Sequence, residues 1–165
     1  MGKPAARVGD FVQHPLPPTL SPGPGSFNVL IGNIPAWRGV PAAVASSLKS
    51  AKKTSDTAIQ AAEKVTAAAP EPASKATAKA AEEATKAASA IAMGTLISST
   101  AAGADIHMCS QPLPIPPHGP GVVVDGSKTV LINGLPACFV GNTIVEAVGP
   151  PNKITNGFTT VLIGG

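Results

Sequence analysis

Two distant stretches of the sequence share one pattern, and this pattern decides the fold. They read Gly25-Ser-Phe-Asn-Val-Leu-Ile-Gly-Asn-Ile-Pro35-Ala36 and Gly126-Ser-Lys-Thr-Val-Leu-Ile-Asn-Gly-Leu-Pro136-Ala137. A third copy begins near the C-terminus as Gly157-Phe-Thr-Thr-Val-Leu-Ile163. Three copies with the same internal spacing indicate a structural repeat, because a chance Gly- and Pro-rich pattern would not keep its register.

The part that the third copy lacks is found at the other end of the chain. Gly2-Lys-Pro-Ala-Ala-Arg-Val-Gly9-Asp10 matches Gly134-Leu-Pro-Ala-Cys-Phe-Val-Gly141-Asn142. The chain therefore holds three units, and one of them is completed only when the two termini come together. We expect a pseudo-threefold β structure that is closed into a ring by its termini.

Each unit reads as two short strands around a tight turn. The runs Val29–Ile31, Val130–Ile132 and Val161–Ile163 are apolar or β-branched and are bounded by glycine, which is typical of strands. A Gly or Asn follows each run and can adopt the positive φ that a tight hairpin needs. Residues 1–39 and 105–165 are thus predicted to form one mainly β domain.

Residues 40–104 interrupt this pattern with a different composition. Of these 65 residues 23 are alanine, the residue with the highest helix propensity. Pro41 and Pro72 stand where a first helical turn tolerates proline, so a helical hairpin with its turn near Pro70 is predicted. Large apolar side chains are few, and a flexible, solvated insertion is the alternative.

Composition excludes several functions. Four Phe, one Trp and no Tyr are too few for the stacking platforms of single-stranded nucleic-acid binding, and two arginines make no basic stripe, so we expect no nucleic-acid partner. The N-terminus lacks the apolar segment of a signal peptide. The uncharged run 87–104 is mainly Ala, Ser, Thr and Gly, and we therefore expect no stable membrane insertion.

The residues that could carry chemistry are three histidines and a cysteine in predicted loops. His14, His107, Cys109 and His118 have the donor atoms that zinc prefers, and a structural zinc site takes four of them. Ordinary surface histidines are the alternative. Cys138 replaces a small residue of the repeat and is expected to be buried in a strand, although it remains a second candidate for the cysteine ligand.

The sequence resembles the PAAR-repeat family. The resemblance rests on Pro4-Ala-Ala-Arg7 with Gly9-Asp10, on the repeat from Gly126 to Ala137, and on His118-Gly119. It implies a small β cone that caps the trimeric VgrG-type spike of a type VI secretion system or a related contractile injection machine, one copy per trimer. Such a protein would be assembled in the bacterial cytoplasm and then delivered out of the cell at the tip of the apparatus.

The resemblance also implies a zinc ion near the tip of the cone, held by His14, His107, His118 and Cys109. Trp37-Arg38-Gly39 and Cys138–Asn142 depart from the family's Ala-Arg-x-Gly-Asp ending, and the loop 143–151 has no cysteine where related sequences often have one. We expect a mechanical rather than enzymatic function, because a hydrolytic metal needs an open coordination position and a base. The alternative is an effector carrier or adaptor whose insertion 40–104 binds an effector, a chaperone or a target membrane.

Overall fold

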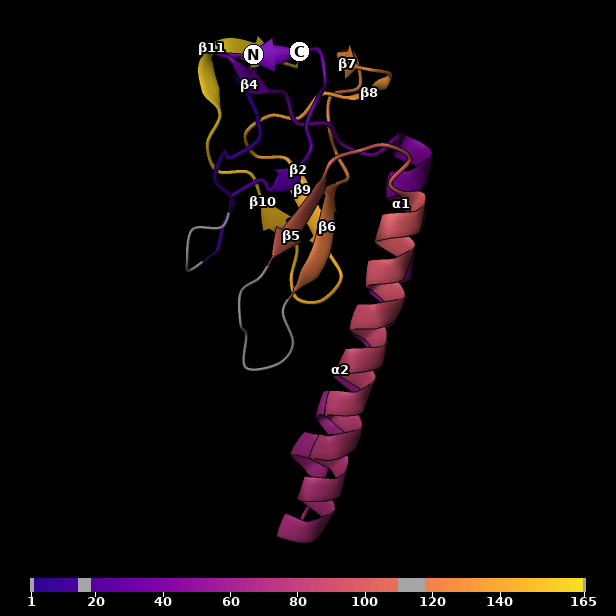
Figure 1. The fold of residues 1–165 in the computed structure, drawn as a ribbon. Helices are drawn as coiled ribbons and strands as arrows, with labels where there is room; N and C mark the ends of the chain where they lie inside the picture. The colour runs from indigo at the N-terminus through magenta and orange to yellow at the C-terminus, as the bar shows by residue number, and fades with distance from the viewer. Residues whose placement is uncertain (1, 15–18, 110–117, 165) are drawn as a thin grey trace.

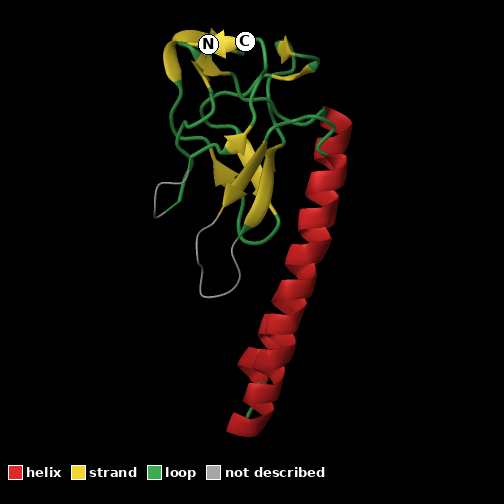
Figure 2. Ribbon diagram, viewed as in Figure 1, coloured by secondary structure: helices red, strands yellow, loops and turns green. Residues whose placement is uncertain are grey.

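The computed structural model describes residues 2–14, 19–109 and 118–164 (Figure 1). Residues 1, 15–18, 110–117 and 165, which belong to the predicted β domain, lie outside the described part. A β body stands beside one long helical hairpin (Figure 2). The elements are β1 (Lys3–Ala5), β2 (Pro22–Gly23), β3 (Leu30–Ile31), β4 (Ile34–Pro35), α1 (Ala42–Ala68), α2 (Pro72–Thr100), β5 (Ile106–Cys109), β6 (Gly119–Val123), β7 (Leu131–Ile132), β8 (Leu135–Pro136), β9 (Thr143–Glu146), β10 (Asn152–Lys153) and β11 (Phe158–Ile163).

The three repeats form three two-stranded units at one end of the body (Figure 1). β3 pairs with β4 and β7 pairs with β8, each across a two-residue turn in which both residues have positive φ. Such turns match the twist of the strands, and Gly and Asn adopt them at low cost. In the unit that the two termini form, β1 pairs with β11, with Pro4 opposite Leu162, so the two ends of the chain do complete one repeat.

Backbone hydrogen bonds join the three units in a closed cycle. The N–H of Ala6 donates to the carbonyl of Cys138 (2.9 Å), that of Cys138 to Trp37 (3.1 Å), and that of Trp37 back to Ala6 (2.9 Å). A second cycle repeats this two residues away, through Val8 to Pro35, Gly39 to Pro136 and Val140 to Pro4. Equivalent positions of the three repeats therefore meet in a ring.

The same equivalence organises the interior of the body. One apolar cluster contains three isoleucines and three alanines that are equivalent in the repeats: Ile31, Ile132, Ile163, Ala5, Ala36 and Ala137. A second cluster contains the next positions, Ala6, Trp37 and Cys138, packed with Val12 and Ile144 among others. This core needs few aromatic rings, because small side chains from three repeats fill it together.

A five-stranded antiparallel sheet, in the order β10-β9-β6-β5-β2, continues the body away from the hairpin units. One face of this sheet is covered by the near half of the helical hairpin, that is, the start of α1 and the end of α2. Leu48 of α1 and Met93 and Ile97 of α2 are buried in one cluster with Val122 and Val145 of the sheet, among others.

The structure does not clearly support a mainly β fold, because two long helices stand beside several small sheets and the fold is mixed. The alanine-rich insertion forms helices of 27 and 29 residues, as its composition indicates, and not a flexible tether. Since an α-helix rises about 1.5 Å per residue, each is roughly 40 Å long, and their far halves extend past the β body (Figure 1). The packing of these helices on the sheet was not predicted, because the insertion has few large apolar residues and they form no obvious pattern in the sequence.

Local signals fix where the helices begin. Pro41 is the N-cap residue of α1, and α2 begins at Pro72 with a capping box between Glu71 and Ser74. Neither helix of the described chain is long and apolar enough to cross a membrane.

Charged groups inside the far half tie the two helices together. The Lys86 ammonium lies 2.7 Å from both Glu82 of its own helix and Glu63 of α1. The Lys79 ammonium also lies 2.7 Å from the Glu82 carboxylate.

Candidate metal centre

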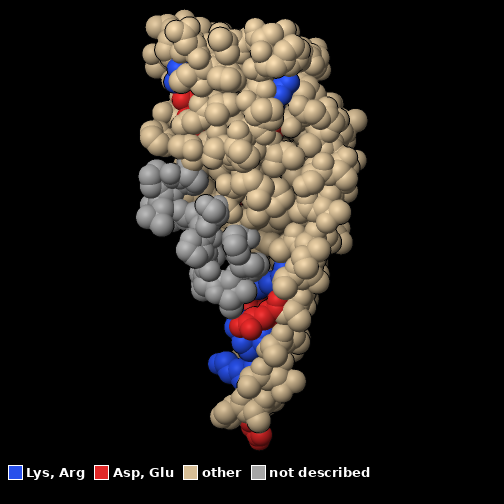
Figure 3. Space-filling model, viewed as in Figure 1, with Lys and Arg blue, Asp and Glu red and all other residues tan. Residues whose placement is uncertain are grey.

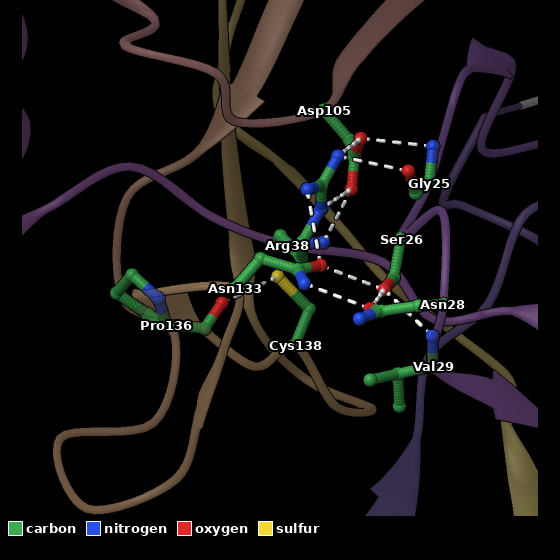
Figure 4. Close-up of polar contacts among 9 residues, drawn as sticks. All are labelled: Gly25, Ser26, Asn28, Val29, Arg38, Asp105, Asn133, Pro136 and Cys138. Carbon is green, nitrogen blue, oxygen red and sulfur yellow. Dashed lines mark hydrogen bonds and ion pairs between the residues drawn. The ribbon is translucent and has the colours of Figure 1, made fainter.

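We number the three repeats by the order of their endings along the chain, which begin at Pro4, Pro35 and Pro136. The insertion 40–104 interrupts the ending of the second repeat, and a buried ion pair between Arg38 and Asp105 closes the gap (Figure 4). The Arg38 guanidinium donates to both carboxylate oxygens of Asp105, at 3.1 and 2.8 Å, and also to the carbonyl of Gly25. Asp105 is fully buried and raises the pKa of Arg38. Asp105 thus supplies the acidic residue that seemed to be missing after Trp37-Arg38-Gly39.

The same side-chain cap recurs in all three repeats. The backbone N–H groups of Arg7, Arg38 and Phe139 donate to the side chains of Asp10 (2.8 Å), Asp105 (2.7 Å) and Asn142 (2.7 Å), in that order. Each of these caps begins a short stretch that runs toward the five-stranded sheet. The residues four positions after the caps are therefore equivalent as well, and they are His14, Cys109 and Glu146.

These three equivalent residues meet, and His107 joins them. The possible ligand atoms of His14, His107, Cys109 and Glu146 all lie within 4.8 Å of one another. Nε2 of His14 lies 3.4 Å from the Cys109 sulfur and 3.1 Å from Oε1 of Glu146. Nε2 of His107 lies 3.5 Å from the same oxygen.

Strand geometry explains how this cluster is assembled. Side chains two positions apart on a strand share a face, so His107 and Cys109 of β5 both point inward while Met108 is exposed. On β6, Gly121 stands opposite Glu146, and a Cβ there would lie 2.8 Å from Cγ of Glu146. The glycine therefore leaves the room that the glutamate side chain occupies.

His118 borders the cluster. Its Nδ1 lies 2.8 Å from Oε2 of Glu146 and 3.7 Å from the Cys109 sulfur. Its Nε2 is buried without a hydrogen-bond partner and faces the backbone of Gly149, where a Cβ would lie 2.7 Å away.

Burial and charge set the state of these groups. Glu146 is fully buried, and burial alone would raise its pKa, but contacts with His107, His14 and Asn152 outweigh this and lower it. Burial lowers the pKa of His118, although the neighbouring Glu146 opposes the shift. The cluster thus combines a buried carboxylate with imidazoles, one of which is held toward its neutral form.

This cluster could hold a metal ion. Two ligands of one tetrahedral zinc ion are about 3.3 to 3.8 Å apart, given bond lengths of about 2.0 to 2.3 Å, and several of the distances above lie in or near this range. Both ring nitrogens of His107 are buried without a hydrogen-bond partner. Buried polar atoms are nearly always satisfied, so unpaired nitrogens inside a donor cluster fit a site for an ion.

The structure brings all four predicted residues into one region, and it adds Glu146, which the sequence reasoning missed as a donor. Cys138 lies elsewhere: it is fully buried in the second apolar cluster, where burial raises the pKa of its thiol well above the usual value. The signal for Glu146 was present, because it follows Asn142 by the four residues that separate His14 from Asp10. The insertion concealed it by separating Arg38 from Asp105.

Comparisons of the chain with protein-family models, with curated proteins and with solved structures found no match.

Proposed function

We propose that this protein is a non-enzymatic tip that caps the trimeric spike of a contractile injection machine of the type VI secretion kind, one copy per trimer. In this proposal the β body is a cone. The hairpin units form its base on the spike, and a structural zinc held among His14, His107, Cys109, His118 and Glu146 fixes the loops toward its apex. The resemblance to PAAR repeats suggests this function, and the surface of the hairpin units supports it.

The observation that carries the proposal is a set of three equivalent exposed leucines. Leu30, Leu131 and Leu162 occupy the same position in the three repeats and are 56, 59 and 58% exposed. Large apolar side chains presented this openly, and three times over, favour a partner surface over solvent. A homotrimer offers three equal surfaces, and a chain with three equivalent apolar positions can contact all of them.

The low charge of the hairpin units and the strand edges at the end of a trimeric spike both support this docking surface. On the face shown in Figure 3 the outer end of the hairpin units carries almost no charged side chains, whereas charges gather on the far half of the helical hairpin. A trimeric β spike ends in unpaired strand edges, which tend to pair with other chains unless they are covered. A cap that seats on all three edges removes that risk.

The donor cluster fits a structural role better than a catalytic one. His107, Cys109, His118 and Glu146 are each at most 5% exposed, so the described residues leave little access for a substrate. A structural zinc contributes directly to folding free energy, which a small body with few aromatic residues needs.

The proposal is tested by changing the three leucines together. The variant L30D/L131D/L162D should fold with unchanged metal content but lose binding to a purified trimeric spike protein of the same genome in analytical ultracentrifugation. The control is I91D, because Ile91 is 71% exposed but lies on α2. Full binding by the folded triple variant would refute the docking surface.

A further inference from the structure

We infer that Glu146 is a direct ligand of the metal ion and that His118 positions it, so that the ligands are His14, His107, Cys109 and Glu146. This inference rests on the proposed metal centre but departs from the ligand set that the sequence suggested. It gives the site one thiolate, two imidazoles and one carboxylate.

The first argument is the equivalence of the repeats. The caps Asp10, Asp105 and Asn142 bind the backbone in the same way in the three repeats. The residue four positions after each cap is a metal-binding type in every case, and the three side chains meet inside one cluster. Glu146 is therefore the contribution of the third repeat, as His14 is of the first and Cys109 of the second.

The second argument is the direction in which His118 points. Its Nδ1 lies 2.8 Å from Oε2 of Glu146 and 3.7 Å from the Cys109 sulfur, so this ring contacts two of the proposed ligands. His118 is nevertheless not among the four residues whose possible ligand atoms all lie within 4.8 Å of one another. Its other nitrogen, Nε2, faces Gly149. We therefore place His118 beside the ligands, where it positions Glu146.

The third argument is charge. Glu146 is fully buried, and its ion-pair contacts among the described residues are with His14, His107 and His118. A buried charge is costly unless it is paired or coordinates a metal. A divalent ion with the thiolate of Cys109 and the carboxylate of Glu146 makes the centre neutral. Asn152 then donates to Oε1 (3.2 Å), as hydrogen bonds commonly hold a coordinating carboxylate, and Nδ1 of His118 lies 2.8 Å from Oε2.

Cobalt(II) is the probe for this assignment, because its visible d–d absorption reports the ligands of the ion. Full-length protein should bind one Co²⁺ with a thiolate-to-cobalt band that C109S removes. E146Q should alter the d–d bands and weaken binding at least about tenfold. H118Q should keep the d–d bands and weaken binding by about 10- to 100-fold, as the loss of a positioning group does. E83Q, which removes a carboxylate from α2, should behave as the unsubstituted protein.

An unchanged d–d spectrum in E146Q would overturn the assignment while leaving the metal centre intact. If E146Q does not fold, E146H replaces one ligand type by another: a new d–d spectrum supports direct binding and an unchanged one overturns it. If the unsubstituted protein takes up no Co²⁺ or Zn²⁺, both the ligand assignment and the metal of the proposed function are refuted. The two failures are thus distinguishable.

Discussion

At the scale of single residues, the pair Arg38–Asp105 decides whether the second repeat closes around its long insertion. The carboxylate binds the Arg38 side chain, the Arg38 backbone and the backbone of Gly25 (Figure 4). Removing one partner of a buried ion pair leaves the other charged and unpaired. We expect D105N to lower the free energy of unfolding by about 3 kcal/mol in denaturant titrations.

The third repeat supplies the control for this prediction. It has Phe139 and Asn142 where the second has Arg38 and Asp105, and Asn142 still caps the backbone of Phe139. The double variant R38F/D105N copies that solution and should be more stable than D105N alone. If the losses of the two single variants simply add, the pair is not the closing contact described above.

The residue scale also shows what the sequence could and could not predict about the site. His14, His107, Cys109 and His118 were predictable from ligand chemistry and the resemblance, because few other donors exist. Glu146 was missed, because the four-residue spacing that links it to His14 and Cys109 becomes visible only once Asp105, beyond the insertion, is recognised as the cap of its repeat. The sequence already favoured Cys109 over Cys138, and in the structure Cys138 is buried in the second apolar cluster while Cys109 lies in the donor cluster.

At the scale of elements, the helical hairpin has two halves with different roles. Its near half, the start of α1 and the end of α2, is part of the core, since Leu48 and Ile97 are fully buried against the sheet. The far half extends past the β body. Replacing residues 61–83 by a short Gly-Ser loop should leave the thermal unfolding midpoint of the β body nearly unchanged. L48A in the full-length chain should cost about 3 kcal/mol. A large loss from the shortened hairpin alone would contradict this division.

The far half should also respond to acid. Contacts with Lys79 and Lys86 lower the pKa of Glu82 from 4.5 to about 2. A lowered pKa in the folded state means stabilisation that is present above pH 4.5 and is lost as the pH falls toward about 2. Thermal unfolding followed by circular dichroism should show the difference between the unsubstituted protein and E82Q shrinking over this range. A constant difference would show that the charge of Glu82 does not matter.

The existence of the helices was predictable from alanine content and proline positions, and the hairpin turns from Gly and Asn in the repeats. The packing of the helices on the sheet was not predictable from the sequence. Leu48, Met93 and Ile97 are widely spaced among alanines, and nothing local in the sequence shows that these three meet the sheet.

At the scale of the whole molecule, one chain arranges three equivalent units in a ring, with exposed leucines on the hairpin units and a donor cluster beside the five-stranded sheet. The proposed function depends on the match between this internal equivalence and a trimeric partner. Native mass spectrometry of the chain mixed with an excess of a trimeric spike protein of the same genome tests that match most directly. We predict one chain per three spike subunits, and no such complex with L30D/L131D/L162D. Three chains per trimer, or no complex with the unsubstituted chain, would contradict the account.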